Sequence, residues 1–202
     1  GKQYQSDLVT AKNSLPIDNV NYQVTNTGLQ INVSTHDPAN NSKYYRWDYE
    51  ETWIIHSKYE SFEMLKTTPG DAIVQRPLDQ QIYTCWIDQR SSDIVLGSTA
   101  PLTRDVLINE PVTFIPASSE RLTQRYSILV RQYTLTKEAY NYFDELRKNT
   151  ESLGTIFDPQ PSMLTGNIHC VTNPAEQVIG YITAGSATQK RIYINRQQLP
   201  FG

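Results

Sequence analysis

The residues that could carry out chemistry are few in this chain and lie far apart. The three histidines are His36, His56 and His169, and no two of them have the His-x-x-x-His spacing that brings two imidazoles to one metal ion. Oxygen ligands occur at residues 36–41, but the segment lacks the ordered carboxylates and carbonyls of a calcium loop. The sequence therefore predicts no metal site and no cofactor, and a solvated turn at residues 36–41.

Two adjacent acids, Glu50 and Glu51, stand between Trp47 and Trp53. Paired carboxylates beside aromatic rings are what a glycoside hydrolase requires. Neighbouring residues of a strand point to opposite faces, so the two acids cannot both reach one substrate unless a bulge intervenes. We interpret the tryptophans as part of an aromatic core row flanked by solvated acids. Since the sequence also lacks a Gly-x-Ser-x-Gly elbow, a phosphate-binding loop and a dinucleotide fingerprint, we expect no catalytic residue and no enzyme activity.

The two cysteines, Cys85 and Cys170, allow two interpretations. An even number of distant cysteines fits one long-range disulfide in an oxidising compartment, and it fits equally well two buried thiols that act as small core residues. Neither cysteine belongs to a Cys-x-x-Cys pair, so the sequence gives no support to a zinc ribbon or a thioredoxin-type redox site.

Composition places the chain among ordinary globular proteins. Of its 202 residues 38% are hydrophobic and 19% charged, and its formal net charge of -3 offers no attraction to nucleic acid. No stretch approaches the roughly 20 apolar residues of a membrane-spanning helix. We expect residues 1–202 to form a single β-rich domain, and the best candidate for an internal boundary lies near residues 57–70, where a polar stretch meets Pro69-Gly70.

Alternation of apolar and polar residues is the main structural signal. Leu29, Ile31 and Val33 alternate with polar neighbours, and a second strand is predicted at 43–55, with a bulge or bend midway and a hairpin or arch at 37–41 before it. Further strands are predicted at residues 82–87, 93–98, 112–115, 125–135, 178–184 and 190–195. So many short strands predict a mainly β fold, an antiparallel β-sandwich of the immunoglobulin or fibronectin type.

One segment, Thr136–Leu153, has helical periodicity instead. Tyr140, Phe143 and Leu146 recur at three- and four-residue spacing, which predicts an amphipathic helix packed on the sandwich by these side chains. Thr136 suits the N-cap, and Gly154 stands where a helix C-terminus favours glycine. We expect this to be the only long helix of the chain.

Several segments in this order resemble a known family. They are residues 44–53 (YYRWDYEETW), Cys85-Trp86, 125–133 (RYSILVRQY), 154–162 (GTIFDPQPS), 166–168 (GNI) and 178–182 (VIGYI). The chain resembles, over nearly its whole length, the Bacteroidota domain-of-unknown-function family 4249. The resemblance implies a lipid-anchored outer-membrane or cell-surface protein that accompanies TonB-dependent transporters. It also implies that this chain is the middle and C-terminal portion of a longer lipoprotein, with the lipid anchor and an N-terminal segment lying outside it.

The resemblance supplies no catalytic residues, and it favours the disulfide over two buried thiols. We therefore expect a non-catalytic cell-envelope accessory protein that binds a small nutrient or docks on an outer-membrane transporter; the alternative is a surface adhesion or glycan-binding module. The ligand-binding residues are not predicted by the sequence. Because loops are positioned by the scaffold without being needed for its packing, we expect a partner surface at residues 57–68 and 159–165.

Overall fold

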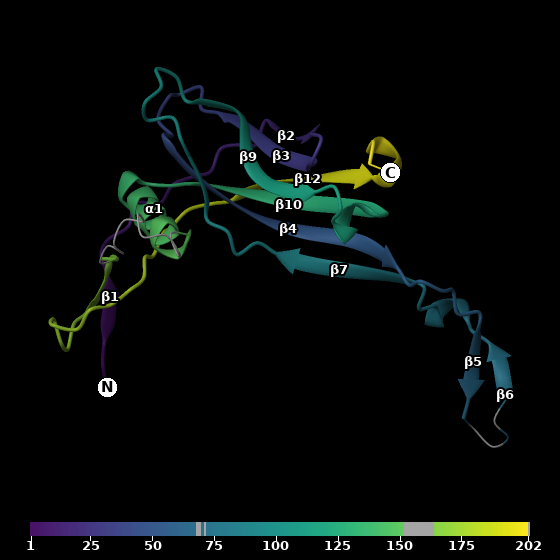
Figure 1. Cartoon of the computed structure of the whole chain (residues 1–202). Helices are drawn as coiled ribbons and strands as arrows, with labels where there is room; N and C mark the ends of the chain where they lie inside the picture. The colour runs from purple at the N-terminus through teal and green to yellow at the C-terminus, as the bar shows by residue number, and fades with distance from the viewer. Residues whose placement is uncertain (68–69, 71, 152–163, 202) are drawn as a thin grey trace, which may run out of the picture.

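The computed structural model describes residues 1–67, 70, 72–151 and 164–201, and these form a two-layer β-sandwich (Figure 1). The main sheet contains, in order, β12 (Thr188–Asn195), β10 (Arg125–Thr134), β4 (Tyr44–His56) and β7 (Thr84–Arg90), and β8 (Val95–Ser98) also pairs with β4. The second sheet contains β2 (Asn19–Val24), β3 (Gly28–His36) and β9 (Val106–Pro116). All of these pairings are antiparallel, so the predicted fold class is confirmed.

The hydrophobic core lies between the two sheets. Each strand contributes alternate side chains, and the largest of those that are fully buried are Trp47, Tyr45, Tyr126, Leu29, Ile31, Ile115, Ile128 and Ile194. The predicted alternation of Leu29, Ile31 and Val33 is confirmed, since all three are buried in β3. Polar side chains also occur among them, and one is Gln132, which accepts a hydrogen bond from the Trp47 indole at 2.9 Å and donates to the Leu15 carbonyl at 3.0 Å. These bonds satisfy the Gln132 amide and the indole N–H of Trp47, which burial would otherwise leave without partners.

Strand β4 does not contain the bulge that its length predicts. It is 13 residues long, and its ladder with β10 runs in continuous register from Tyr45 to Trp53. The interruption lies on its other edge, where β8 pairs with the first part of β4 and β7 with the second. Two shorter strands therefore share one edge of β4, while its edge with β10 is continuous.

The turn at 37–41 is an arch, one of the two forms predicted, because it joins β3 of one sheet to β4 of the other. Asp37 is buried, and its carboxylate accepts hydrogen bonds from the backbone N–H groups of Ala39 and Asn41, both at 2.9 Å. Asn40 adopts a left-handed conformation with φ 59°, which asparagine tolerates better than most residues. Burial raises the pKa of Asp37, but the hydrogen bonds from the backbone lower it by more than that. The pKa of Asp37 is therefore lowered overall.

The predicted helix is α1 (Lys137–Glu151), and Thr136 caps it by accepting a hydrogen bond from the Ala139 N–H at 3.2 Å. Residues 152 and 153, and the predicted C-cap Gly154, lie outside the described residues. The most buried side chains of α1 are Ala139 and Tyr142, while the predicted contacts Tyr140, Phe143 and Leu146 are half-buried. Tyr140 and Phe143 pack against a small hydrophobic cluster that includes Leu96 of β8, so this part of the predicted contact is confirmed. The prediction missed Tyr142, whose ring lies 5.1 Å from that of Tyr181, centroid to centroid.

The part of the chain that the structure describes has no second α-helix, and α1 is neither long nor apolar enough to cross a membrane. Besides α1, the described residues contain three short 3-10 helices: η1 (Leu78–Gln80), η2 (Glu120–Leu122) and η3 (Arg196–Gln198).

The predicted strand at 178–184 is wrong. The segment forms no strand, because its hydrogen bonds go mainly to one side chain. Its one backbone partner is at the end of the segment, where the Lys12 N–H donates to the Ala184 carbonyl at 3.0 Å. The Asn167 amide accepts a hydrogen bond from the Ile182 N–H at 2.8 Å and donates one to the Ile182 carbonyl at 3.0 Å. Gly166, which precedes Asn167, lies against the backbone of Gly180. A Cβ atom on residue 166 would be 1.6 Å from the Gly180 carbonyl oxygen, so only glycine fits there. The sequence pattern of this segment does not show whether its hydrogen-bond partner is a neighbouring strand or a side chain.

Between β4 and β7 the chain leaves the sandwich. We call residues 57–83 the arm; it contains the antiparallel ribbon of β5 (Glu63–Lys66) and β6 (Ala72–Gln75), and Figure 1 shows it projecting from the end of the main sheet opposite α1. The candidate boundary near 57–70 falls where the chain enters the arm. A second small ribbon, of β1 (Tyr4–Ser6) and β11 (Ile168–Cys170), lies at the α1 end.

The disulfide between Cys85 and Cys170 is not formed, and both cysteines are free thiols. Cys85 pairs with Ile55 at the start of β7, next to the arm, whereas Cys170 pairs with Tyr4 in the ribbon at the other end of the sandwich (Figure 1). A disulfide requires the two Cα atoms within about 7 Å. The two thiols belong to different sheets, so this fold does not bring them together.

We predict that replacing Asp37 by Asn lowers the free energy of unfolding by about 1–2 kcal/mol near neutral pH, because charge-assisted hydrogen bonds to backbone N–H groups are lost. The folded pKa is lowered, so the stability that the carboxylate provides is present above its unfolded pKa of about 3.9 and is lost as the pH falls through the folded value. Urea unfolding from about pH 7 to about pH 2 should show the two curves converging in acid.

The matched control for Asp37→Asn is Asp79→Asn, since Asp79 is exposed in η1. We expect the control to stay within about 0.5 kcal/mol of the wild type at every pH. A constant difference between Asp37→Asn and the wild type down to low pH would contradict the role of the charge.

We predict that a thiol reagent modifies Cys85 and spares Cys170 in the native protein, because Cys85 is exposed and Cys170 is 2% exposed. Both should react after denaturation without a reductant. Mass spectrometry of the labelled peptides distinguishes the two positions. If neither cysteine reacts in denaturant, both thiols are oxidised, and that result would contradict the two free cysteines of this fold.

Candidate functional site

The face of the main sheet that points away from β2, β3 and β9 is largely free of covering structure. We call it the outer face. On β4 it presents Arg46, Asp48, Glu50 and Thr52, which alternate with the inward-facing core residues. Helix α1 covers only the end near β8, where Leu96, Leu135 and Ala139 form a small separate hydrophobic cluster. The rest of the outer face carries two hollows.

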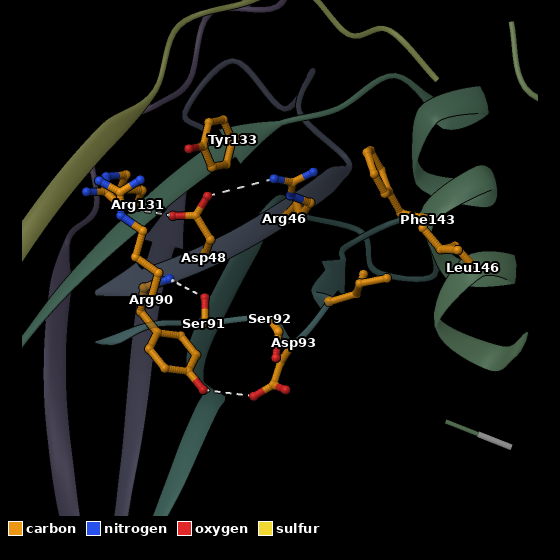
Figure 2. A pocket seen from close by; sticks show the side chains of 12 residues that line it. Arg46, Asp48, Arg90, Ser91, Ser92, Asp93, Arg131, Tyr133, Phe143 and Leu146 are labelled. Carbon is orange, nitrogen blue, oxygen red and sulfur yellow. Dashed lines mark hydrogen bonds and ion pairs between the residues drawn. The ribbon is translucent and has the colours of Figure 1, made fainter. Parts of the chain in front are cut away.

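The first hollow has a volume of about 470 Å³ and lies where β7 ends and β8 begins (Figure 2). Its charged side chains pair with one another. Arg131 forms ion pairs with Asp48 at 3.3 Å and Glu50 at 2.9 Å, Arg46 lies 3.7 Å from Asp48, and Arg90 lies 3.6 Å from Glu50. We call this set the paired cluster.

Hydrogen bonding fixes the charge states within the paired cluster. The hydrogen bond from Arg131 is the main cause that lowers the pKa of Glu50, and the bond to Glu50 is the main cause that raises the pKa of Arg131. Arg46 also lies over the rings of Tyr133 and Phe143, with centroid distances of 5.1 and 4.7 Å, and Figure 2 shows it between them. Each arginine thus already has an anionic partner, and a ligand carboxylate would have to compete with Asp48 or Glu50 for the guanidinium.

Tyr49 forms the inner wall of this hollow. Its hydroxyl donates to Asp93 at 2.8 Å, and its backbone N–H donates to the Ser91 hydroxyl at 2.9 Å. Burial is the main cause that raises the pKa of Tyr49 to about 12, and its hydrogen bond to Asp93 acts in the same direction. A phenol with this pKa remains protonated at neutral pH and serves as a donor that positions Asp93.

The second hollow has a volume of about 350 Å³ and lies toward the arm end of the outer face. Trp86 of β7 and Tyr193 of β12 stand on its two sides, and they are 60% and 56% exposed. Ser127 and Thr52 lie opposite each other on the two central strands between them. Arg125 and Arg191 complete the lining. We call this second hollow the aromatic cradle.

The arginines of the aromatic cradle differ from those of the paired cluster. Arg125 lies over the Tyr193 ring at 4.9 Å from its centroid, and Arg191 donates to the Ser127 hydroxyl at 2.9 Å. Within the residues that the structure describes, neither of them has an ion pair. Arg191 lies near enough to Glu50 to lower the pKa of that acid, but Glu50 is bonded to Arg131.

Glu50 and Glu51 point to opposite faces of β4, as predicted, but the prediction that both are solvated is wrong for Glu51. Glu51 is 2% exposed and faces the core. It accepts hydrogen bonds from Arg121 at 3.0 and 3.1 Å and from the Tyr126 hydroxyl at 2.7 Å. Arg121 also covers the Trp53 ring at 5.4 Å from its centroid. Glu51 is therefore bonded within the structure and is not an acid that is free to react with a substrate.

The structure does not bring the three histidines together. His36 contacts Asp18 at 2.8 Å, His169 contacts Asp7 at 3.0 Å, and His56 stacks on Tyr83 with centroids 4.4 Å apart. Across the described ranges no group of three or more His, Cys, Asp or Glu side chains is placed to hold a metal ion.

Of the two loops predicted as partner surfaces, residues 57–67 belong to the arm, whereas most of 159–165 lies outside the described residues. The aromatic cradle was missed by sequence reasoning. The available signal was that Trp86, Arg125, Arg191 and Tyr193 all lie in predicted strands, but only strand pairing shows that they share a face.

We predict that replacing Tyr126 by Phe destabilises the protein by about 1–3 kcal/mol, because the buried Glu51 loses a hydrogen-bond donor. Urea unfolding at neutral pH measures the change. The matched control is Tyr59→Phe, since Tyr59 is exposed and its hydroxyl faces solvent in the arm. An equal effect of both substitutions would show that the contact with Glu51 contributes nothing.

Comparison with known proteins identifies a family and nothing more specific. No curated protein and no solved structure matches the chain. The family model that does match is described as a domain of unknown function, DUF4249, and it covers residues 1–191, which include every strand of the sandwich except the end of β12. This chain therefore belongs to the DUF4249 family.

Proposed function

We propose that this chain is a non-catalytic accessory protein of the cell envelope that docks through its arm on an outer-membrane, TonB-dependent transporter. The observation that carries the proposal is the arm itself. Its exposed large apolar side chains are Tyr59, Phe62, Leu65, Ile73, Leu78 and Ile82. Isolated surface apolar residues need no explanation, but six in one projecting segment indicate a contact surface.

The ribbon of the arm lacks the support that a two-stranded sheet normally needs. Leu65 pairs with Ile73 across β5 and β6, and both side chains point into solvent, 57% and 73% exposed. A two-stranded ribbon on its own is marginally stable in water, so burial of this pair against a partner would stabilise it. Among the described residues neither β5 nor β6 pairs with a third strand, so the partner could also add a strand at an edge.

The base of the arm offers a second point of contact. A hollow of about 700 Å³ lies there, lined by Phe62, Leu78 and Tyr83 together with polar side chains. Arg76 holds this region together by donating to the Ser61 hydroxyl at 3.2 Å and to the Gln80 carbonyl at 3.3 Å. Apolar side chains interleaved with polar ones are typical of a protein interface, which favours a protein partner over lipid.

The proposal that the protein is non-catalytic is supported by the ion pairs and hydrogen bonds of its acidic side chains. On the outer face Asp48 and Glu50 are ion-paired with arginines, and in the core Glu51 is bonded to Arg121 and Tyr126. A general acid or base needs a titratable group free to exchange a proton with a substrate. Location at the outer membrane is supported by the family resemblance.

A second candidate function is a surface adhesion or glycan-binding module. The specific observation in its favour is the aromatic cradle, where Trp86 and Tyr193 are exposed on either side of two hydroxyl side chains. Sugar rings stack their apolar faces on such side chains and direct their hydroxyl groups to polar neighbours.

We predict that the double substitution Leu65→Glu/Ile73→Glu in the full-length, membrane-anchored protein reduces the amount of cross-linked transporter at least about tenfold, because two charges would have to be buried at the interface. Mass spectrometry must identify the cross-linked protein as a TonB-dependent transporter. The matched control is Ile108→Glu/Ile179→Glu, since these residues are 74% and 73% exposed outside the arm.

Circular dichroism and thermal unfolding should show that both double variants keep the fold. The docking proposal is wrong if the arm variant captures the transporter as well as the wild type does. It is also wrong if the cross-linked protein is not an outer-membrane transporter.

A further inference from the structure

We infer that the aromatic cradle is a binding site for an acidic saccharide, a sugar that carries one carboxylate per ring. The inference goes beyond docking by the arm; it names the ligand of the second candidate function and rests on that candidate. Three properties of the cradle lead to it: two exposed aromatic side chains, two arginines without an ion pair, and a floor of hydroxyl groups.

The cradle has the dimensions of a ring-sized site. Trp86 and Tyr193 belong to the two edge strands β7 and β12, which are separated by three strand intervals of roughly 4.8 Å, or about 14 Å in all. The residues beside Tyr193 are short, since Tyr193 pairs with Ser127 and Ser127 pairs with Thr52. Trp86 lies one row further along the outer face, where it pairs with Ile54. A volume of about 350 Å³ lies within the range of small-molecule sites. A flat ring can therefore lie on the floor with its face against Trp86.

Trp86 is suited to this role because it is the exposed tryptophan of the chain. The other two tryptophans, Trp47 and Trp53, are buried in the core. Trp86 is 60% exposed on the face that lacks a covering layer. An indole at this position offers a large apolar surface to the C–H face of a sugar ring, whose burial is favourable for both partners.

The charge of the cradle selects an anion. Arg125 and Arg191 have no ion-pair partner among the described residues, whereas every arginine of the paired cluster has one. Stacking on Tyr193 holds the guanidinium of Arg125 in place, and the hydrogen bond to Ser127 holds that of Arg191. Guanidinium groups that are positioned in this way bind a carboxylate through paired hydrogen bonds.

The same charges favour a single carboxylate over a phosphate dianion. Asp88 lies in the same row of the outer face and accepts a hydrogen bond from the Thr52 hydroxyl at 2.6 Å. Two arginines and one aspartate leave one net positive charge, which a monoanion neutralises. The hydroxyl of Ser127 and the carboxylate of Asp88 then remain as donor and acceptor for the hydroxyl groups of the sugar.

Isothermal titration calorimetry of the intact protein with a trimer of galacturonic acid tests the inference, with the neutral galactose trimer, benzoate and AMP as comparison probes. We expect the acidic trimer to bind and to weaken at high salt, since its charge is screened. It should quench tryptophan fluorescence, because Trp86 is the exposed indole. Equal binding of the neutral trimer, tighter binding of benzoate or AMP, or no binding of the acidic trimer at millimolar concentration would overturn the inference.

Variants assign the binding to the cradle. Arg125→Gln, Arg191→Gln and Trp86→Ala should each weaken binding of the acidic trimer about tenfold, the usual effect of losing one charge-assisted or stacking contact. Arg104→Gln is the matched control, since Arg104 is exposed in a loop outside the cradle and its loss changes the net charge equally. Unchanged binding in all three cradle variants, with their fold verified by thermal unfolding, would overturn the assignment.

The arm variant separates this inference from docking. Leu65→Glu/Ile73→Glu should bind the acidic trimer with wild-type affinity, because neither residue lines the cradle. Loss of trimer binding in the arm variant, with the fold intact, would contradict a separate site in the cradle.

Discussion

The alternation of strand β4 is the constraint on which the rest of this structure depends. Adjacent residues of a strand face opposite sides of the sheet, so the continuous ladder from Tyr45 to Trp53 fixes the role of both sets of side chains at once. Tyr45, Trp47 and Tyr49 build the core against the second sheet. The residues between them form the centre of the outer face. A slip of one residue would bury Arg46, Asp48 and Glu50 and expose the aromatic row, so the register is strongly determined.

The core that results is not purely apolar. Glu51 and Gln132 point inward from neighbouring strands, and each has partners that satisfy it: Arg121 and Tyr126 for Glu51, Trp47 and Leu15 for Gln132. Buried polar networks add little net stability over well-packed apolar residues, but breaking one leaves an unpaired group at a high cost. These contacts therefore penalise alternative packings of the two sheets more than they stabilise the native one.

The arginines of the outer face fall into two groups that differ in their partners. In the paired cluster, Arg46, Arg90 and Arg131 neutralise Asp48 and Glu50, and together they keep a sheet face soluble without a covering layer. In the aromatic cradle, Arg125 and Arg191 are held in place by an aromatic ring and a hydroxyl rather than by an acid. The arm adds an apolar surface at the same end. The two surfaces proposed for recognition, the aromatic cradle and the arm, thus lie at the same end of the sandwich, opposite α1 (Figure 1).

Sequence by itself determined what depends on local periodicity. The alternation around Leu29 and Tyr45 identified two central strands, helical spacing and Thr136 identified α1, and the order of its motifs identified the family. Tertiary structure alone decided what depends on contacts between distant segments. It placed Cys85 and Cys170 in different sheets, gave the 178–184 segment a side-chain partner, buried Glu51, and assembled the cradle from Trp86, Arg125 and Tyr193. The reason is physical: a period of two fixes which residues share a face of one strand, but it does not specify which strands become neighbours.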